Sequence, residues 1–168
     1  GPDDLPLWGC HGNVIRYNTV LMANPERAAL QFRNGSWGGH VRNNIVVNDK
    51  GASIEVFNTS IYRLDSGYNV TNVVSYRGMP ESLKTLAVAL DEKNHSVTGM
   101  TRARLSAEFV APSDEPWVVL EGRWWRLNPK RPDFRPQAQS GVLSGTGDPR
   151  ERVAHDLAGQ VRRRADIG

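Results

Sequence analysis

The sequence has 168 residues, of which 39% are hydrophobic, and a formal charge of +3. This length and composition allow one buried core, so we expect a single domain over residues 1–168. Sixteen glycines and ten prolines, against 8% aromatic residues, favour a fold with many turns over a helical bundle. The single cysteine, Cys10, excludes an internal disulfide and a cysteine-based zinc site.

Charge and hydropathy limit the partners. A charge of +3 without a focused basic patch does not indicate nucleic acid. The basic surplus lies in residues 121–168, and its densest point, residues 162–164, is interpreted as a solvated charge run. No apolar run reaches the roughly 18 residues of a membrane span, and the N-terminus lacks the pattern of a signal peptide. We therefore expect neither a nucleic-acid partner nor a membrane span.

The first third of the chain contains an internal repeat. Residues 14–20 match residues 40–46, which lie 26 positions later, and residues 67–70 repeat the same pattern after 25 more. A second run, residues 28–36, aligns without gaps against residues 52–60. A period of about 25 residues is typical of stacked solenoids and is short for a propeller blade of about 40–45 residues.

The content of each repeat predicts strands. Each repeat holds two short runs rich in Val, Ile, Asn and Thr, separated by turn residues, and no segment is long enough for a helix. We predict an all-β fold, a single-stranded parallel β-helix, with repeat coils over residues 9–78. In such a solenoid equivalent residues stack, so Leu30 should lie over Ile54, and Phe32 over Val56, inside the coils.

Asparagines recur at two positions of the repeat. A stacked amide can satisfy its donors and acceptors along the stack, so we interpret these residues as structural ladders in preference to sugar contacts. One predicted ladder contains Asn18, Asn44 and Asn69, and the other contains Asn34 and Asn58.

Residues 79–97 interrupt the repeat with a predicted helix. Pro80 stands where a helix can begin, and apolar residues recur at helical spacing from Leu83 to Leu90. We expect one short helix near residues 80–93, with its apolar face against the coils.

Residues 98–147 hold the final predicted strands and a closing coil. Residues 117–127 are predicted to form two strands around Glu121-Gly122, a hairpin signal. Trp124 and Trp125 would point to opposite faces of a regular strand. An exposed indole stacks well on a sugar ring, so both are candidate substrate-binding residues, although a tryptophan that covers the end of a solenoid is the commoner use. Residues 148–168 are expected to form an irregular C-terminal tail.

The repeat phrases resemble those of a known family. Residues 11–18 and 40–45 look like coil repeats of the right-handed parallel β-helix superfamily, which includes pectate lyases and secreted bacterial proteins. Residues 82–97 resemble an insertion found in members of that superfamily, residues 133–147 are similar to a closing coil, and residues 156–168 to a C-terminal signature. The resemblance implies a right-handed, pectate-lyase-like solenoid.

The same resemblance implies where the protein acts. Members of the superfamily have more coils upstream, and their signature runs a few residues further, so we expect this chain to be part of a longer polypeptide or an unusually short member. We also expect a secreted or cell-surface protein whose partner is an extracellular polysaccharide.

Candidate catalytic residues lie at the coil starts. Polysaccharide lyases of the resembled family use a basic residue to remove a proton next to a uronate carboxylate, frequently with calcium. Arg16 and Arg42 recur at one coil position and would clamp a carboxylate, and His40 would accept a proton. Asp65 is the candidate acid. The alternative is that the arginines are solvated outward residues and that Asp65 forms a turn.

Two functions remain open from the sequence. In the first, the protein is a polysaccharide lyase or glycoside hydrolase for acidic glycans, which requires Arg16, Arg42, His40 and Asp65 to converge in one groove. In the second, it is a non-catalytic carbohydrate-binding or surface structural module, which allows these residues to scatter. The sequence predicts no metal site and shows no cofactor motif. Calcium enters only as an implication of the resemblance.

Overall fold

The computed structural model describes residues 10–61, 63–82, 84, 94–112, 117–120, 123–126, 133–151, 161 and 167. From residue 14 to residue 77 the chain passes three times through the same three sheets, and each pass is called a rung. The first rung contains β1 (Val14–Arg16), β2 (Thr19–Met22) and β3 (Leu30–Phe32). The second contains β4 (His40–Arg42), β5 (Ile45–Asn48) and β6 (Ile54–Phe57), and the third β7 (Asp65–Gly67), β8 (Val70–Thr71) and β9 (Val74–Arg77).

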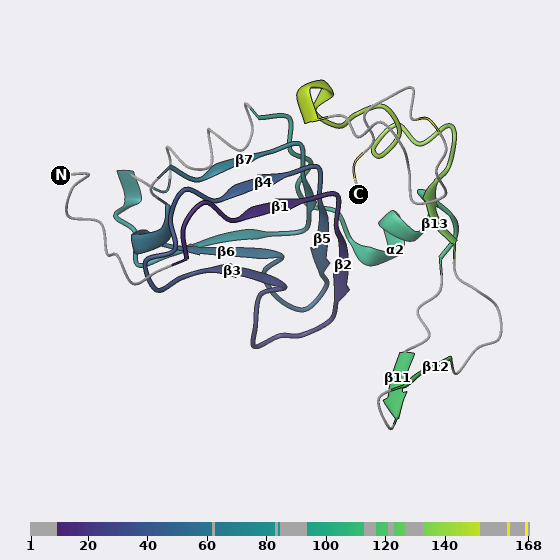
Figure 1. The fold of residues 1–168 in the computed structure, drawn as a ribbon, viewed down its shortest axis with the longest axis horizontal. Helices are drawn as coiled ribbons and strands as arrows, with labels where there is room; N and C mark the ends of the chain where they lie inside the picture. Colours follow the sequence, from purple (N-terminus) through teal and green to yellow (C-terminus); the bar gives the residue numbers. More distant parts are fainter. Residues whose placement is uncertain are drawn as a thin grey trace.

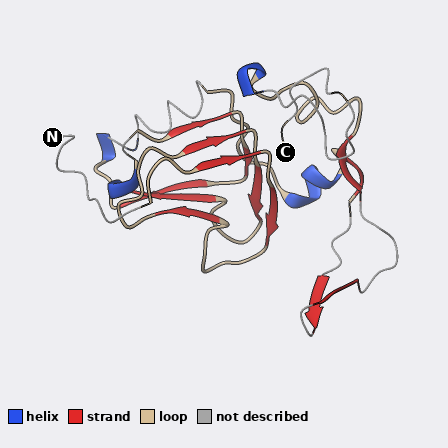
Figure 2. Cartoon of the chain, in the orientation of Figure 1, coloured by secondary structure: helices blue, strands red, loops and turns tan. Residues whose placement is uncertain are grey.

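The rungs stack into three parallel three-stranded sheets, ordered β1-β4-β7, β2-β5-β8 and β3-β6-β9 (Figure 1). The registers are those that the repeat predicts: Leu30 pairs with Ile54, and Arg16 with Arg42. Strands make up most of the regular structure, and helices are short and lie outside the sheets (Figure 2). This architecture is compatible with the predicted parallel β-solenoid.

A sharp corner between the first and second sheets is repeated in every rung. One residue at each corner has a left-handed backbone, which non-glycine residues adopt rarely. These residues are Tyr17, Asn43, Tyr68 and His95, with φ of 57°, 58°, 52° and 59°. The fourth corner belongs to the start of another rung, because Val97 forms a parallel bridge with Val70.

The residue after each corner forms a polar ladder. The Asn18 side-chain amide donates to Asn44 Oδ1 at 3.2 Å, and that of Asn44 donates to Asn69 Oδ1 at 3.1 Å. The Asn69 backbone N–H donates to Ser96 Oγ at 3.3 Å, so serine ends the stack. Asn44 and Asn69 are 0% and 1% exposed. The ladder therefore satisfies backbone and side-chain polar groups that no water reaches.

A second asparagine stack lies at the turn after the second sheet, and the sequence analysis did not identify it. The Asn48 side-chain amide donates to the backbone oxygens of Asn24 and Arg27, each at 2.9 Å, and its Oδ1 accepts from the Asn24 N–H. Asn72 donates to the backbone oxygen of Asn48 at 3.2 Å. Asn48 is fully buried, so these bonds hold three successive turns together.

Asn34 and Asn58 do not share a conformation. Asn34 has a φ of 57°, whereas Asn58 begins a 3-10 helix, η2 (Asn58–Ser60). Both side chains are exposed, and neither donates to the other in the hydrogen bonds of the described residues. The predicted ladder of Asn34 and Asn58 is therefore absent. Strands β3 and β6 stack in register, but the chain turns differently after β6 than after β3.

Two apolar clusters stabilise the stack. The interior cluster lies between the three sheets and contains Val41, Val46, Ile54 and Val56. The outer cluster lies on the other face of β5, where Ile45 and Val47 pack against residues from the later part of the chain: Met100, Leu105, Phe109, Leu143 and Ile167. Strand β5 is thus buried on both faces, as its continuous apolar run indicates.

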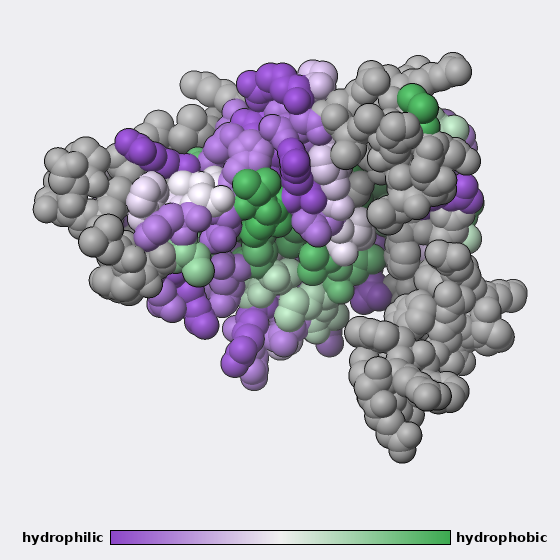
Figure 3. Space-filling view, in the orientation of Figure 1, coloured by the Kyte–Doolittle hydropathy of each residue, from purple (hydrophilic) through white to green (hydrophobic). Residues whose placement is uncertain are grey.

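Among the described strands, those of the first rung form one edge of each sheet, which we call the free edge. In the space-filling view, hydrophobic side chains gather on this face of the molecule (Figure 3). Val14 is 61% exposed, and Ile15, Val20 and Leu21 are half-buried. The corresponding Val41, Val46 and Val47 of the second rung are almost completely buried. Burial of these apolar side chains, in the interior and on the outer face, therefore depends on having a rung on each side.

The elements after residue 80 only partly follow the sequence predictions. The helix expected near 80–93 falls mostly outside the described residues, although Glu81, Ser82 and Lys84 at its start are helical. A helix that was not predicted, α2 (Arg102–Ser106), follows Thr101, whose side chain accepts from the Arg104 N–H. None of the helices in the described part of the chain has the length and hydropathy needed to span a bilayer.

The last strands pair antiparallel. The predicted hairpin is present as β11 (Trp117–Leu120) and β12 (Arg123–Arg126). β13 (Asp133–Pro136) pairs with β10 (Phe109–Ala111), also antiparallel. The closing coil expected over residues 133–147 is therefore not a parallel rung at β13, since that strand returns beside β10 instead of stacking on β7, β8 or β9. The tail contains one described helical turn, η3 (Pro149–Glu151).

The stacking of Leu30 on Ile54 makes a direct prediction. Ile54 is 4% exposed, and a carboxylate there has no partner to offset its loss of hydration. We expect Ile54→Asp to remove the cooperative thermal transition seen by circular dichroism. Val73→Asp, at a position 49% exposed, is the matched control and should melt like the wild type. A cooperative, soluble Ile54→Asp protein would contradict the register.

The asparagine ladder predicts a graded loss of stability. Asn44→Ala leaves buried partners on both sides unsatisfied, so the free energy of unfolding should fall by about 2–3 kcal/mol in urea titrations. Asn18→Ala changes an exposed residue at the free edge and should cost less than about 1 kcal/mol. Equal losses from the two variants would show that the ladder does not stabilise the stack in this way.

Candidate functional site

The four residues proposed from the sequence as catalytic lie together on the outer face of the first sheet. His40 pairs in register with Asp65 on the next strand, and Arg16 pairs with Arg42. His40 Nδ1 lies 2.9 Å from Asp65 Oδ2, and Arg42 Nε donates to the same oxygen at 3.0 Å. The alternation of β4 directs Val41 inward, so His40 and Arg42 point outward.

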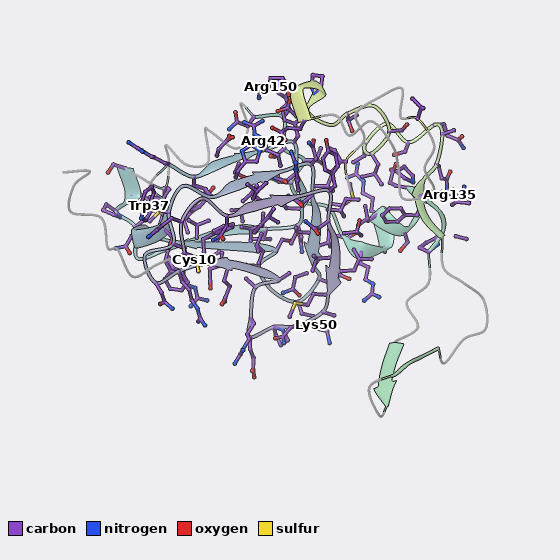
Figure 4. All side chains as sticks on the ribbon, in the orientation of Figure 1. Cys10, Trp37, Arg42, Lys50, Arg135 and Arg150 are labelled. Atoms are coloured by element: carbon purple, nitrogen blue, oxygen red, sulfur yellow. The ribbon has the colours of Figure 1, made fainter. Side chains whose placement is uncertain are left out.

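The tail completes this cluster. η3 lies beside the first sheet (Figure 1), and Arg42 and Arg150 lie close together in the side-chain view (Figure 4). Arg42 Nη1 donates to Asp148 Oδ2 at 2.6 Å, and Arg16 Nη1 donates to Glu151 Oε2 at 2.9 Å. We call this set the charged cluster; it contains Arg16, His40, Arg42, Asp65, Asp148, Arg150 and Glu151.

Asp148 is the most buried member of the charged cluster. It is 0% exposed, and its backbone N–H donates to Asn43 Oδ1 at 2.7 Å. Arg150 donates to both of its carboxylate oxygens, at 3.0 Å and 2.8 Å. The hydrogen bond from Arg150 is the main reason that the pKa of Asp148 is lowered from 3.8 to about 2, and the charge of Arg42 adds to it. Asp148 is therefore a carboxylate at neutral pH.

Asp65 and Arg42 stabilise each other's charged forms. The side-chain hydrogen bond from Arg42 lowers the pKa of Asp65, with a smaller contribution from the charge of His40. The same bond raises the pKa of Arg42, against the opposing effect of its burial. The Arg42 guanidinium also lies over the ring of Tyr68, 5.8 Å from its centroid. Arg42 thus has partners on three sides and only 8% of its side chain exposed.

The charges within the cluster balance. Three arginines face three carboxylates, each in at least one ion pair. His40 lies between two of the carboxylates, with Nδ1 toward Asp65 and Nε2 3.3 Å from Glu151 Oε1. An imidazole held between carboxylates has the geometry to exchange a proton with either one. The arrangement can therefore bind carboxylates and, at His40, transfer protons.

The sequence pattern gives no signal for the three tail members of the charged cluster. Asp148, Arg150 and Glu151 belong to a short charged turn without a repeat or motif, and Asp148 is separated from its partner Arg42 by 106 positions. Only the approach of the tail to the first sheet brings them together. The buried Asn43, whose Oδ1 receives the Asp148 N–H, was also not identified.

Glu55 and the candidate substrate-binding residues Trp124 and Trp125 belong to other sheets than the charged cluster. His11 packs its ring on Trp37, with centroids 4.6 Å apart. Glu55 is buried and pairs with Gln31 and Arg77 on the third sheet. Trp124 and Trp125 belong to β12, opposite Val119 and Val118, and the orientation of their side chains is outside what the structure describes.

The described residues contain no group of three or more His, Cys, Asp or Glu side chains arranged to hold a metal ion. In the charged cluster, Asp65 contacts Nδ1 of His40 and Glu151 contacts Nε2. The two carboxylates therefore lie on opposite sides of the imidazole and do not point toward one common position where a metal ion could bind.

Comparisons with known proteins give no assignment. Neither the protein-family models nor the curated proteins nor the solved structures contain a match to this chain. The function must therefore be inferred from the fold and the charged cluster.

The lowered pKa of Asp148 predicts an acid-sensitive contribution to stability. Its ion pairs favour folding when the carboxyl is charged, so the contribution is complete above the ordinary pKa of 3.8 and disappears as the pH falls toward about 2. The contribution is at most about 2 kcal/mol, and solvent near Arg150 reduces it.

Urea titrations between about pH 5 and pH 2 measure this contribution, because they follow the free energy of unfolding through the titration. The wild type should lose more stability over this interval than Asp148→Asn, which has no carboxyl to protonate. Parallel pH profiles for the two proteins would contradict the assignment.

Proposed function

We propose that the chain is a right-handed parallel β-helix module, related to the pectate-lyase-like solenoids, that binds an extracellular polysaccharide without cleaving it. Three parallel sheets in register and a repeat of about 25 residues support the solenoid part of the proposal. The resemblance of the coil phrases supports polysaccharide as the partner and a secreted or cell-surface location.

The balance of charge in the charged cluster is the observation that carries the non-catalytic function. A lyase needs a base free to reach the substrate and a cation free to hold the uronate carboxylate. Here Arg42 is almost fully buried between Asp65 and Asp148, and Arg16 and His40 both contact Glu151. The residues that would perform catalysis are thus engaged with the chain's own carboxylates. One of these carboxylates, Asp65, belongs to β7 and stays beside His40 and Arg42 wherever the tail lies.

A second candidate function is a polysaccharide lyase or glycoside hydrolase, and one observation favours it. His40 contacts two carboxylates, and 27% of its side chain is exposed. Imidazole next to a carboxylate is a common arrangement in general acid–base catalysis. In this function His40 would take the proton, and Asp65 would hold the imidazole. Calcium, which lyases of the resembled family frequently use, would be an added cofactor.

Binding and cleavage can be measured on the same samples. The protein is incubated with immobilised and soluble polysaccharides, acidic (polygalacturonate, alginate) and neutral (xylan, dextran), with calcium or with a chelator. We expect retention on at least one polysaccharide, with no new reducing ends and no absorbance of unsaturated products.

Variants separate the two functions. Product formation that His40→Ala abolishes would establish the enzyme and overturn the non-catalytic function. If the protein binds none of the polysaccharides, both the binding function and the enzymatic function are wrong. Glu81→Gln serves as the control, because the Glu81 side chain is 84% exposed and pairs with Lys84 within its own helical turn.

A further inference from the structure

We infer that the charged cluster is a binding site for the carboxylates of an acidic polysaccharide, and that Asp148 and Glu151 of the tail occupy it in the absence of that ligand. The inference rests on the proposed polysaccharide-binding function and names the site, the chemical class of ligand and the segment that competes with it.

The two tail carboxylates are bound as a ligand would be bound. Asp148 receives a hydrogen bond from Arg42 at 2.6 Å, and Glu151 receives one from Arg16 at 2.9 Å while it faces His40. Arg16 lies on β1, His40 and Arg42 lie on β4, and Arg16 pairs in register with Arg42 one rung away. The face of the first sheet therefore presents donors for two carboxylates in a row, which is the pattern of a chain of uronate residues.

Removal of the tail would change the charge of this face. With Asp148, Arg150 and Glu151 in place, three positive and three negative side chains balance. Without them, Arg16 and Arg42 face only Asp65, and His40 adds positive charge when it is protonated. The exposed face would then carry a net positive charge and free guanidinium donors, which suit a polyanion with carboxylate groups.

Residues 148–151 of the tail can leave the first sheet without taking the fold apart. Leu143 and Ile167, on either side of η3 in the sequence, are anchored in the outer apolar cluster, and the Ile167 N–H donates to Leu143 O at 3.0 Å. Among the described residues, the contacts that Asp148 and η3 make with the first sheet and its corners are polar: they involve Arg16, Tyr17, His40, Arg42 and Asn43. A polyanion can replace the carboxylate contacts of Arg16, Arg42 and His40, whereas it cannot replace apolar packing.

Competition in the same chain sets the size of the expected effect. A tethered segment competes at an effective concentration of the order of millimolar, so weakening it should raise ligand affinity strongly. We expect Glu151→Gln to bind polygalacturonate at least about tenfold more tightly than the wild type, and Asp148→Asn/Glu151→Gln more tightly still. The affinity for neutral xylan should be the same for the wild type, Glu151→Gln and the double variant.

Isothermal titration calorimetry with size-defined galacturonate oligomers measures these affinities, at low and high salt. Glu81→Gln is the matched control, since it removes an exposed carboxylate of an ion pair outside the charged cluster, and its affinity should equal that of the wild type. Arg16→Gln added to Glu151→Gln should abolish the gain. Because Arg16 is half exposed, this variant is expected to fold.

Hydrogen exchange reports displacement of the tail directly. The Asp148 N–H is bonded to the buried Asn43 Oδ1, and the peptide that contains it should exchange faster when galacturonate oligomers bind to the wild type. Unchanged exchange at saturating ligand would overturn the inference even if the oligomers bind, because the ligand would then lie elsewhere.

The outcomes distinguish the inference from the proposed function. If the wild type binds a polysaccharide and Glu151→Gln gives no gain, the inference is wrong and the binding function stands. If neither the wild type nor any variant binds a polysaccharide, the inference and the proposed function are both wrong. A gain for galacturonate that requires Arg16 supports both.

Discussion

The structure depends on one constraint: each rung must lie directly over the next, so that backbone groups of three sheets pair at the same time. The interior offers no alternative partner for these groups, and a shift by one residue would exchange inward and outward side chains. Residues such as Asn44 and Asn48 extend the pairing through the corners, where strands end. The charged cluster exists because the same stacking places Arg16 beside Arg42 and His40 beside Asp65.

Where side-chain types recur at the same strand position of successive rungs, the sequence was sufficient to predict the register. The registers of Leu30 with Ile54 and of Arg16 with Arg42 are confirmed, because a stack repeats side-chain types at a fixed period. The second asparagine stack was missed although its members, Asn24, Asn48 and Asn72, stand 24 positions apart, because the turns that contain them differ in composition. Asn34 and Asn58 align equally well but adopt different conformations, since the turn that follows each strand decides the backbone there.

The charged cluster shows what a repeat in the sequence cannot predict. Its four coil residues follow from the repeat, but their role depends on Asp148 and Glu151, which no periodicity connects to residues 16–65. Contacts across 106 positions require knowledge of where the tail lies. The four residues predicted to be catalytic do lie together, as an active site requires. They are nevertheless paired with carboxylates of the same chain. Grouping of catalytic residue types is thus as typical of an internal electrostatic contact as of an active site.

Nuclear magnetic resonance of the uniformly labelled protein tests the stacking most directly. Adjacent parallel strands lie about 4.8 Å apart, close enough for nuclear Overhauser effects between their residues. The account predicts cross-peaks linking the side-chain amides of Asn18, Asn44 and Asn69 in sequence, together with contacts between Leu30 and Ile54. Cross-peaks that instead connect Leu30 or Asn44 to an antiparallel neighbour, with none between successive rungs, would contradict the account.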